Sequence, residues 1–415
     1  MQSLKNATLA AHLSRSLNYV MPLLTLMLAG LAMLGPFTTD TYFPFFPDIQ
    51  THFAISQAAA QQSLSVYLFT FTFMMLFHGA ISDSAGRKPV IVISLIGFVI
   101  TSFGCAMADS YALLLGMRAG QGFFVGAGTV VGQAIIRDQF HGAEAQKRIA
   151  MVTMLFGISP AIAPMVGGWL HVYFPWQSAF VFLAALGLIL TWLCASRLPE
   201  TLPKDQRRSF HPASLLRNYC AIAGNVRFMM LSLCIGTGFG GFLVYVAGAP
   251  DFVLHVMRLS ELQFGWLFIP IVIGLITGSA LAGRLVSTLP GRTIIRMAYG
   301  LLALASIGNL AYNWLTTPEL PYAVAPILIY TLGVTMLMPA VLTLALDIFP
   351  EKKGMAASVQ GFVQSIIFTL ISAFIVPFVL GNSLHYAVAM SGLFVLNLAA
   401  WCIYKKRTVR SAVLA

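Results

Sequence analysis

Long apolar stretches alternate with short polar breaks along the whole of this 415-residue chain. Each stretch has about the 20 residues that an α-helix needs to cross the hydrocarbon core of a bilayer. The pattern predicts twelve membrane-spanning helices, at about 19–44, 60–81, 90–108, 111–135, 149–173, 178–196, 228–249, 264–286, 294–315, 322–346, 355–380 and 386–404. The first span is long, and Pro36 and Pro44 predict that its helix bends or ends at these residues.

One longer polar segment divides the spans into two sets of six. It runs over about 197–227 and carries Arg197, Lys204, Arg207, Arg208, Arg217 and Arg227. We therefore expect six-helix halves at 1–197 and 228–415, joined by a connector at 198–227. The loops after the second and eighth spans both contain Gly-Arg, which indicates that the two halves are repeats of one another. Together with the twelve spans, this predicts an all-α membrane protein with two pseudo-symmetric halves around a central cavity.

The composition supports a membrane protein and excludes several other classes. Hydrophobic residues make up 58% of the chain and charged residues only 9%, whereas a soluble domain has about 25% charged residues. This excludes an ordinary soluble enzyme and a disordered protein. The strands of a membrane β-barrel would alternate apolar and polar residues, and the sequence has no such alternation.

The net charge of +11 follows from topology. Of the 24 Lys and Arg residues, 22 fall in segments on one side of the membrane; Arg258 lies on the other side and Arg118 lies within a span. Because basic loops stay in the cytosol, we expect a multi-pass protein of the bacterial inner membrane with both termini cytosolic. The basic residues then contact anionic lipids and require no nucleic-acid partner.

Several kinds of chemistry lack the residues they need. The five cysteines are odd in number and scattered, so they predict neither a disulfide framework nor a zinc site. No lysine follows a glycine, which excludes a Walker-type phosphate loop. We expect no metal, no cofactor and no enzymatic activity, and we expect a monomer whose partners are protons, small molecules and lipids.

Asp40 in the first predicted span and Arg118 in the fourth lie at similar depth in the membrane. An ionised carboxylate within the bilayer is unfavourable, so Asp40 can bind a proton from one side and release it. An unpaired buried arginine is also unfavourable, which predicts that Arg118 is a neighbour of Asp40 and tunes its proton binding. The alternatives are an Asp40 in headgroup water and an Arg118 that extends to the membrane surface.

Polar positions form one face on each of two spans. The fourth span places Arg118, Gln121, Thr129 and Gln133 on one helical face, and the eleventh span places Gln360, Gln364 and Phe368 on another. Polar side chains that face lipid would lack partners, so these faces and Tyr42 predict the wall of a wet cavity that binds substrate. Hydrogen bonds between neighbouring helices are the alternative.

Four segments resemble motifs of the major facilitator superfamily, each in the expected span. They are Gly79-x-x-x-Asp83-x-x-Gly86-Arg87-Lys88 after the second span, Arg118-Ala-Gly-Gln121-Gly122 in the fourth, Gly157-Ile-Ser-Pro160-Ala-Ile-Ala-Pro164-Met-Val-Gly167-Gly168 in the fifth and Thr39-Asp40-Thr41-Tyr42 in the first. The last of these, with Leu198-Pro199-Glu200-Thr201, is similar to the Bcr/CflA drug-resistance branch. Ser84 and Gln177 depart from the usual pattern, which has a basic residue and an arginine there.

The resemblance implies a proton-coupled antiporter that exports small, largely apolar drugs or toxic compounds by alternating access. Export of a specific metabolite, such as an amino acid or a sugar, by the same fold is the alternative. A carboxylate is favoured at a helix N-terminus, which predicts that position for Asp83, with Arg87 reaching Asp138. The resemblance implies that such a charge cluster, with Gly79, Gly86 and Lys88, latches the cytosolic gate. The alternative is that Arg87 and Lys88 only determine the topology. The resemblance also implies a hinge in the fifth span at Gly157, Pro160, Pro164, Gly167 and Gly168.

Overall fold

The computed structural model describes residues 23–207 and 210–414, so Arg208 and the predicted start of the first span at 19 lie outside the described residues. Twelve helices in this part of the chain are long and apolar enough to cross a membrane, which confirms the predicted all-α, twelve-span architecture. The N-terminal half holds the span Leu23–Phe53, α3 (Gln57–Ala85), α4 (Arg87–Ala106), α5 (Tyr111–Gln139), α6 (Gly142–Tyr173) and α7 (Gln177–Arg197). The C-terminal half holds α9 (Val226–Ala247), α11 (Gly265–Leu285), α12 (Gly291–Leu315), α13 (Ala325–Leu346), the span Pro350–Val379 and α16 (Ser383–Leu414).

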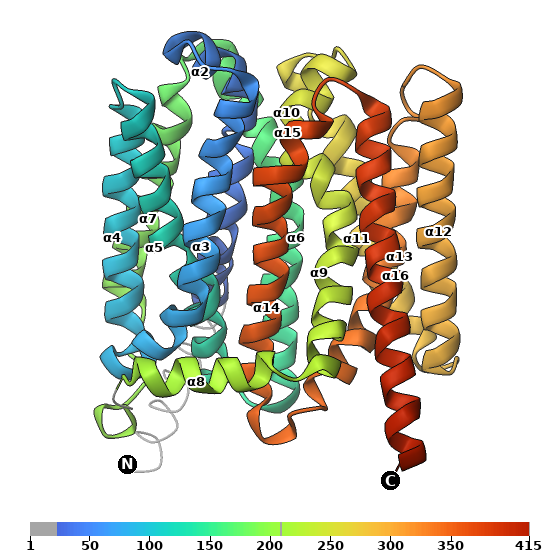
Figure 1. Ribbon diagram of the computed structural model, residues 1–415. Coiled ribbons are helices and arrows are strands. Elements are labelled where there is room, and N and C mark those ends of the chain that lie inside the picture. The colour runs from blue at the N-terminus through green and yellow to red at the C-terminus, as the bar shows by residue number, and fades with distance from the viewer. Residues whose placement is uncertain (1–22, 208–209, 415) are drawn as a thin grey trace, which may run out of the picture.

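Helix α8 (Pro212–Ala223) lies in the segment between the halves and runs along the lower side of the molecule in Figure 1, the side on which α16 also ends. We call this side the connector face and the other side the opposite face. The halves end at Arg197 and resume at Val226, close to the predicted boundaries at 197 and 228. The division of the chain into domains at these positions stays a prediction.

The first span continues further than predicted. The sequence predicts an end near Pro44, but the span reaches Phe53 through a 3₁₀ turn, η1 (Phe43–Phe45), and helix α2 (Phe46–Phe53). The expected end at Pro44 is therefore wrong. Pro44 and Pro47 both lie in the first turn of a new helix, where a backbone N–H has no helical partner and a proline is tolerated.

The eleventh span also changes its helical form along its length. It consists of α14 (Lys353–Leu370), the π-helical segment η6 (Ile371–Ile375) and α15 (Val376–Val379). A π-helical segment holds an extra residue in its turn and commonly occurs at functional positions. In this protein the segment faces α3 of the other half.

The two halves repeat one packing scheme. In the N-terminal half α3 packs on α5, α4 packs on α5 and α4 packs on α7. In the C-terminal half the corresponding spans do the same: α11 packs on α13, α12 packs on α13 and α12 packs on α16. The predicted pseudo-symmetry of the halves is confirmed at the level of helix pairs.

The halves meet along two equivalent seams, one between α3 and α14 and one between α6 and α11. On the first seam, Gln61 Nε2 donates to Ser372 Oγ at 3.1 Å and to the carbonyl of Ala247 at 3.1 Å. Ser65 Oγ lies 3.0 Å from Ser372 Oγ. These bonds lie in the part of α3 near the opposite face, so the halves are joined by direct polar contacts there.

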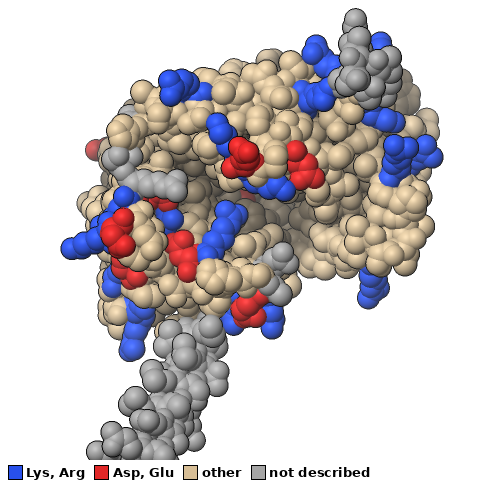
Figure 2. Space-filling model, turned by 90° about the horizontal axis from the view of Figure 1, so that it is seen from below, with Lys and Arg blue, Asp and Glu red and all other residues tan. Residues whose placement is uncertain are grey.

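The connector face differs in shape and charge from the apolar sides of the bundle. Figure 2 shows Lys and Arg side chains gathered on this face, with acidic side chains among them and a hollow near its centre. Large apolar side chains such as Ile93, Ile100 and Trp192 are instead exposed on the sides of the spans. An apolar belt of this kind fits a lipid environment.

Candidate functional site

Asp40 is the last helical residue before a turn that breaks the first span. The residue is 3% exposed, and Thr39 Oγ1 donates to its Oδ1 oxygen at 2.7 Å. The next residue is also closely covered, because a β-carbon at Gly167 of α6 would overlap the carbonyl oxygen of Thr41. The carboxyl group of Asp40 therefore lies inside the protein, and within residues 23–207 and 210–414 a single hydroxyl group donates to it.

Arg118 lies in the interior of the N-terminal half and is fully buried. Its Nη1 donates to the carbonyl of Thr38 at 3.0 Å and to Gln121 Oε1 at 2.9 Å. Its guanidinium carbon lies 4.9 Å from the centre of the Tyr42 ring and 4.7 Å from that of Tyr67. Cation–π contacts of this kind stabilise a positive charge away from water.

The structure joins Arg118 to the backbone that carries Asp40, through the Thr38 carbonyl, whereas the bond described for the Asp40 carboxylate comes from Thr39. Tyr67 holds the same segment, because its hydroxyl donates to the carbonyl of Gly35 at 3.1 Å. Two further guanidinium nitrogens of Arg118, Nε and Nη2, are buried without a hydrogen-bond partner. The bonds of Arg118 and Tyr67 therefore fix the end of the helix that presents Asp40.

Two of the candidate substrate residues lie in the packed interior of the N-terminal half in this structure. Gln121 is fully buried and donates to Ser102 Oγ on α4 at 2.8 Å. Tyr42 is also fully buried, with its hydroxyl 2.8 Å from Ser63 Oγ. Both side chains form hydrogen bonds between neighbouring helices, which the sequence analysis gave as the alternative to lining a cavity. A substrate role for them stays a prediction.

The other candidate substrate residues are more accessible. Thr129 is half-buried and donates to a carbonyl of its own helix, and Gln133 is exposed. On α14, Gln360 is buried and donates to Gln364 Oε1 at 3.2 Å, while Gln364 and Phe368 are half-buried. These five positions on α5 and α14 stay predictions for the cavity wall.

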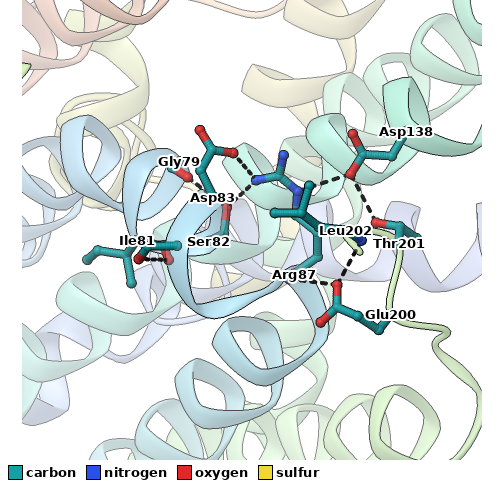
Figure 3. A network of polar contacts seen from close by, with 10 residues as sticks. Gly79, Ile81, Ser82, Asp83, Arg87, Asp138, Glu200, Thr201 and Leu202 are labelled. Carbon is teal, nitrogen blue, oxygen red and sulfur yellow. Dashed lines mark hydrogen bonds and ion pairs between the residues drawn. The ribbon is translucent and has the colours of Figure 1, made fainter. Parts of the chain in front are cut away.

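The predicted latch residues form a compact network around Arg87, which begins α4 (Figure 3). Arg87 Nη1 donates to Asp83 Oδ1 at 2.5 Å and to Ser82 Oγ at 2.6 Å. Arg87 Nε donates to Asp138 Oδ2 at 3.0 Å, and Thr201 Oγ1 donates to the same oxygen at 3.0 Å. The network connects the ends of α3, α4 and α5 with the start of the connector.

The carboxylate at the N-terminus of α4 is Glu200, and not Asp83 as the sequence predicts. Asp83 lies in the last turn of α3. Glu200 Oε1 accepts from the backbone N–H of Arg87 at 3.0 Å, and Glu200 Oε2 lies 3.5 Å from Arg207 Nη2. A carboxylate is favoured there because the first N–H groups of a helix lack partners within it. The sequence singled out Glu200 only as part of the Leu198-Pro199-Glu200-Thr201 segment and did not predict this contact.

The remaining latch residues have different positions. Gly86 adopts a φ of +104° between α3 and α4. The carbonyl of Gly79 accepts from Ser82 Oγ at 2.8 Å, and Lys88 is half-buried beside the network. All the bonds described here stay within the N-terminal half and the connector.

The proposed hinge residues all belong to α6, which continues as one helix through Pro160 and Pro164. A β-carbon at Gly168 would overlap the backbone carbonyl of Glu261, which belongs to the other half. Gly157 has no neighbour within 4 Å of the position its β-carbon would take. Gly168 is thus a point of close backbone contact between the halves, and the hinge itself stays a prediction.

Comparisons with known proteins agree with this architecture. Residues 27–374 match the family described as Major Facilitator Superfamily. The chain is 24% identical over 387 residues to a bicyclomycin resistance protein homolog of Haemophilus influenzae, covering 93% of this chain and 97% of that protein. It is 30% identical over 320 residues to the multidrug transporter MdfA of Shigella boydii, covering 74% and 75% of the two chains. A solved bacterial homolog of the human lysosomal transporter Spinster, in an inward-facing and occupied conformation, has the same fold, with a TM-score of 0.70, 18% identity and coverage of 94% and 96%.

Proposed function

This chain belongs to the Major Facilitator Superfamily, and on that premise we propose that it is a transporter, not an enzyme, that exports small, largely apolar drugs or toxic compounds in exchange for protons. The names of the relatives, which include bicyclomycin resistance and multidrug transport, support drugs as the substrate class. The pairwise repeat of the two halves supports transport by alternating access.

The observation that carries the proposal is the burial of Asp40, to which only the Thr39 hydroxyl donates among the residues that the structure describes. A carboxylate with so few partners is poorly stabilised in its charged form. In our proposal Asp40 binds a proton in the state open to the outside and releases it in the state open to the cytosol. The deprotonated carboxylate is then ready for substrate to bind. This order couples the inward flux of protons to the outward flux of substrate.

Arg118 tunes this step through the helix that presents Asp40. Its bond to the Thr38 carbonyl transmits movement of α5 to the helical end that carries Asp40. Arg118 is thus a positioning residue, and Asp40 is the group that carries the proton.

We further propose that the connector face lies in the cytosol of a bacterium, with the chain in the inner membrane. The partition of basic residues supports this orientation. The network of Asp83, Arg87 and Asp138 lies on that face, with its bonds within the N-terminal half and the connector in this structure. In our proposal the network contacts the C-terminal half and latches the cytosolic gate when the protein opens outward. The polar bonds of Gln61 and Ser65 near the opposite face support an outward gate that is closed in this structure.

The experiment is transport by purified protein in proteoliposomes with an imposed pH gradient. A panel of chemically unrelated apolar compounds is screened for proton-driven accumulation, and proton release on addition of an active compound is followed in weak buffer. Asp40→Asn removes the titrating group and nearly keeps its shape. We expect the variant to fold and to bind compounds, but to lose both accumulation and proton release.

The matched control is Asp48→Asn, which changes another carboxylate of the same span. The side chain of Asp48 is 45% exposed, with Oδ2 3.1 Å from His171 Nε2, so it lies at the protein surface. We expect Asp48→Asn to transport as the unaltered protein does. Undiminished proton release by Asp40→Asn would contradict the proton assignment, and accumulation of a single metabolite alone would contradict the drug assignment.

A further inference from the structure

A second buried carboxylate lies at the opposite face, in the C-terminal half. Asp251 ends the short helix α10 (Ala249–Asp251), which follows α9 and lies near α15 in Figure 1. The residue is only 2% exposed. The sequence gives no sign of this burial, because Asp251 comes after the predicted end of the seventh span at 249.

Hydrogen-bond donors from both halves of the protein surround Asp251. Within its own half, Oδ2 accepts from the backbone N–H of Gly381 at 2.8 Å and from the hydroxyl of Tyr386 at 3.0 Å. From the other half, Gln57 Nε2 donates to Oδ1 at 2.8 Å. His255 Nδ1 lies 3.5 Å from Oδ1 and 3.3 Å from Gln57 Nε2.

The bond from Gln57 differs from the rest of the seam in its chemistry. Gln57 is the first residue of α3 and lies at the outermost end of that helix. Further along the same helix, the cross-half partners of Gln61 and Gln62 are a hydroxyl and backbone carbonyls, all of them neutral. Hydrogen bonds to a charged acceptor are about twice as strong as neutral ones. The Asp251–Gln57 pair is therefore the strongest polar link described on this seam.

We propose that Asp251 is the gate residue of the opposite face, where its carboxylate holds Gln57 and keeps the two halves closed. The proposal rests on alternating access, since the halves can separate on this face only after the Asp251–Gln57 bond breaks. The bonds of Asp251 to Gly381 and Tyr386 hold the carboxylate in place while Gln57 leaves. The gate thus has a fixed acceptor in one half and a donor that moves with the other.

The test measures the separation of the halves directly and needs neither substrate nor proton flux. The exposed cysteines Cys220 and Cys402 are first replaced by serine. Spin labels are then placed at Met107 and Tyr322, which are 78% and 65% exposed and lie in loops of the two halves at the opposite face. Pulsed dipolar spectroscopy of the protein in nanodiscs measures the distance between the two labels. The ratio of long to short label distances gives the ratio of open to closed molecules at this face.

Gln57→Leu removes the cross-half donor and leaves the bonds of Asp251 within its own half. We expect it to raise the open-to-closed ratio about tenfold, the scale of one hydrogen bond to a charged group. Asp251→Asn should raise it in the same direction, and the two changes together should add little to either alone. Gln62→Leu, which removes a neutral bond of 3.4 Å to the carbonyl of Ala373, is the matched control and should have a smaller effect.

An unchanged distance distribution in both Gln57→Leu and Asp251→Asn would overturn the proposal. Equal opening by Gln57→Leu and Gln62→Leu would also overturn it, because closure would then be spread along the seam. Both results are independent of whether Asp40→Asn abolishes transport. Failure of the gate assignment and failure of the proposed function can therefore be told apart.

Discussion

Gly86 joins α3 to α4 with a φ of +104°, a backbone conformation that is unfavourable for any residue with a β-carbon. The space beside it is also occupied. A β-carbon would lie 2.5 Å from Glu200 Oε2 and 2.7 Å from Arg207 Nη2. Because Gly86 has no side chain, Glu200 of the connector can accept a hydrogen bond from the backbone N–H of Arg87, the first residue of α4.

Gly86→Ala should destabilise this junction by about 1–2 kcal/mol from the backbone alone, with a further cost from displacement of Glu200. Thermal unfolding in detergent should show a lower midpoint, and the connector should be cleaved faster by protease. Gly116→Ala is the control, since nothing lies within 4 Å of its β-carbon and it is within α5. It should be neutral or stabilising by up to about 1 kcal/mol. Equal midpoints for the two variants would contradict this account of Gly86.

At the scale of residues, the sequence predicts which charged residues are buried or form a network better than it predicts their hydrogen-bond partners. The contact of Arg87 with Asp138 follows from the motif and is present at 3.0 Å. The expected pairing of Arg118 with Asp40 is replaced by a bond to the Thr38 carbonyl and by two tyrosine rings. Similar depth on two helices does not determine which side of each helix faces the other, and that depends on the packing of the whole half.

At the scale of single elements, α6 contacts both halves near the opposite face. Gly167 lies against the carbonyl of Thr41 in its own half, and Gly168 lies against the carbonyl of Glu261 in the other. Neither overlap could be relieved by rotation of a side chain, because both neighbours are backbone atoms. The two adjacent glycines thus let α6 join the turn beyond Asp40 to the C-terminal half.

Gly168→Ala should push the C-terminal half away from α6 at the opposite face. Overpacking of this kind costs about 1–3 kcal/mol, so the population with that face open should rise. The Met107–Tyr322 label pair reports this change. Gly157→Ala, on the same helix with no neighbour within 4 Å, should leave the distances unchanged. Identical distances in the two variants would show that Gly168 does not govern the contact.

The number and the type of the elements follow from the sequence, because a spanning helix must satisfy all its backbone hydrogen bonds and stay apolar for about 20 residues. The ends are less predictable. Hydropathy ends the first span near Pro44, but the chain continues as η1 and α2 to Phe53. Apolar contacts with the other half bury this extension. The ring of Phe43, for example, stacks on that of Phe268 in α11, with 6.4 Å between the ring centres. Hydropathy along the sequence does not include such contacts.

At the scale of the whole molecule, the two seams are related by the same pseudo-symmetry as the halves. Each pairs the second span of one half with the fifth span of the other, α3 with α14 and α6 with α11. A movement of α3 against α14 on one seam therefore has its counterpart in a movement of α11 against α6 on the other. The repeat is only weakly visible in the sequence, as Gly-Arg at 86–87 and 291–292, because packing requires similar shapes and not similar residues.

The orientation of the molecule in the membrane is a prediction from charge, and two exposed positions on opposite faces test it. Cys220 lies on α8 at the connector face, and Met107 lies in the loop between α4 and α5 at the other. In intact cells, a membrane-impermeant thiol reagent should label a Met107→Cys variant that lacks Cys220 and Cys402. It should label Cys220, in a variant that lacks Cys402, only after the membrane is permeabilised. The reason is that Lys and Arg near the ends of spans oppose translocation, and the sequence predicts 22 of the 24 in segments on one side of the membrane. Labelling of Cys220 in intact cells, with Met107→Cys protected, would invert the topology and move the Asp83–Arg87–Asp138 network to the outside.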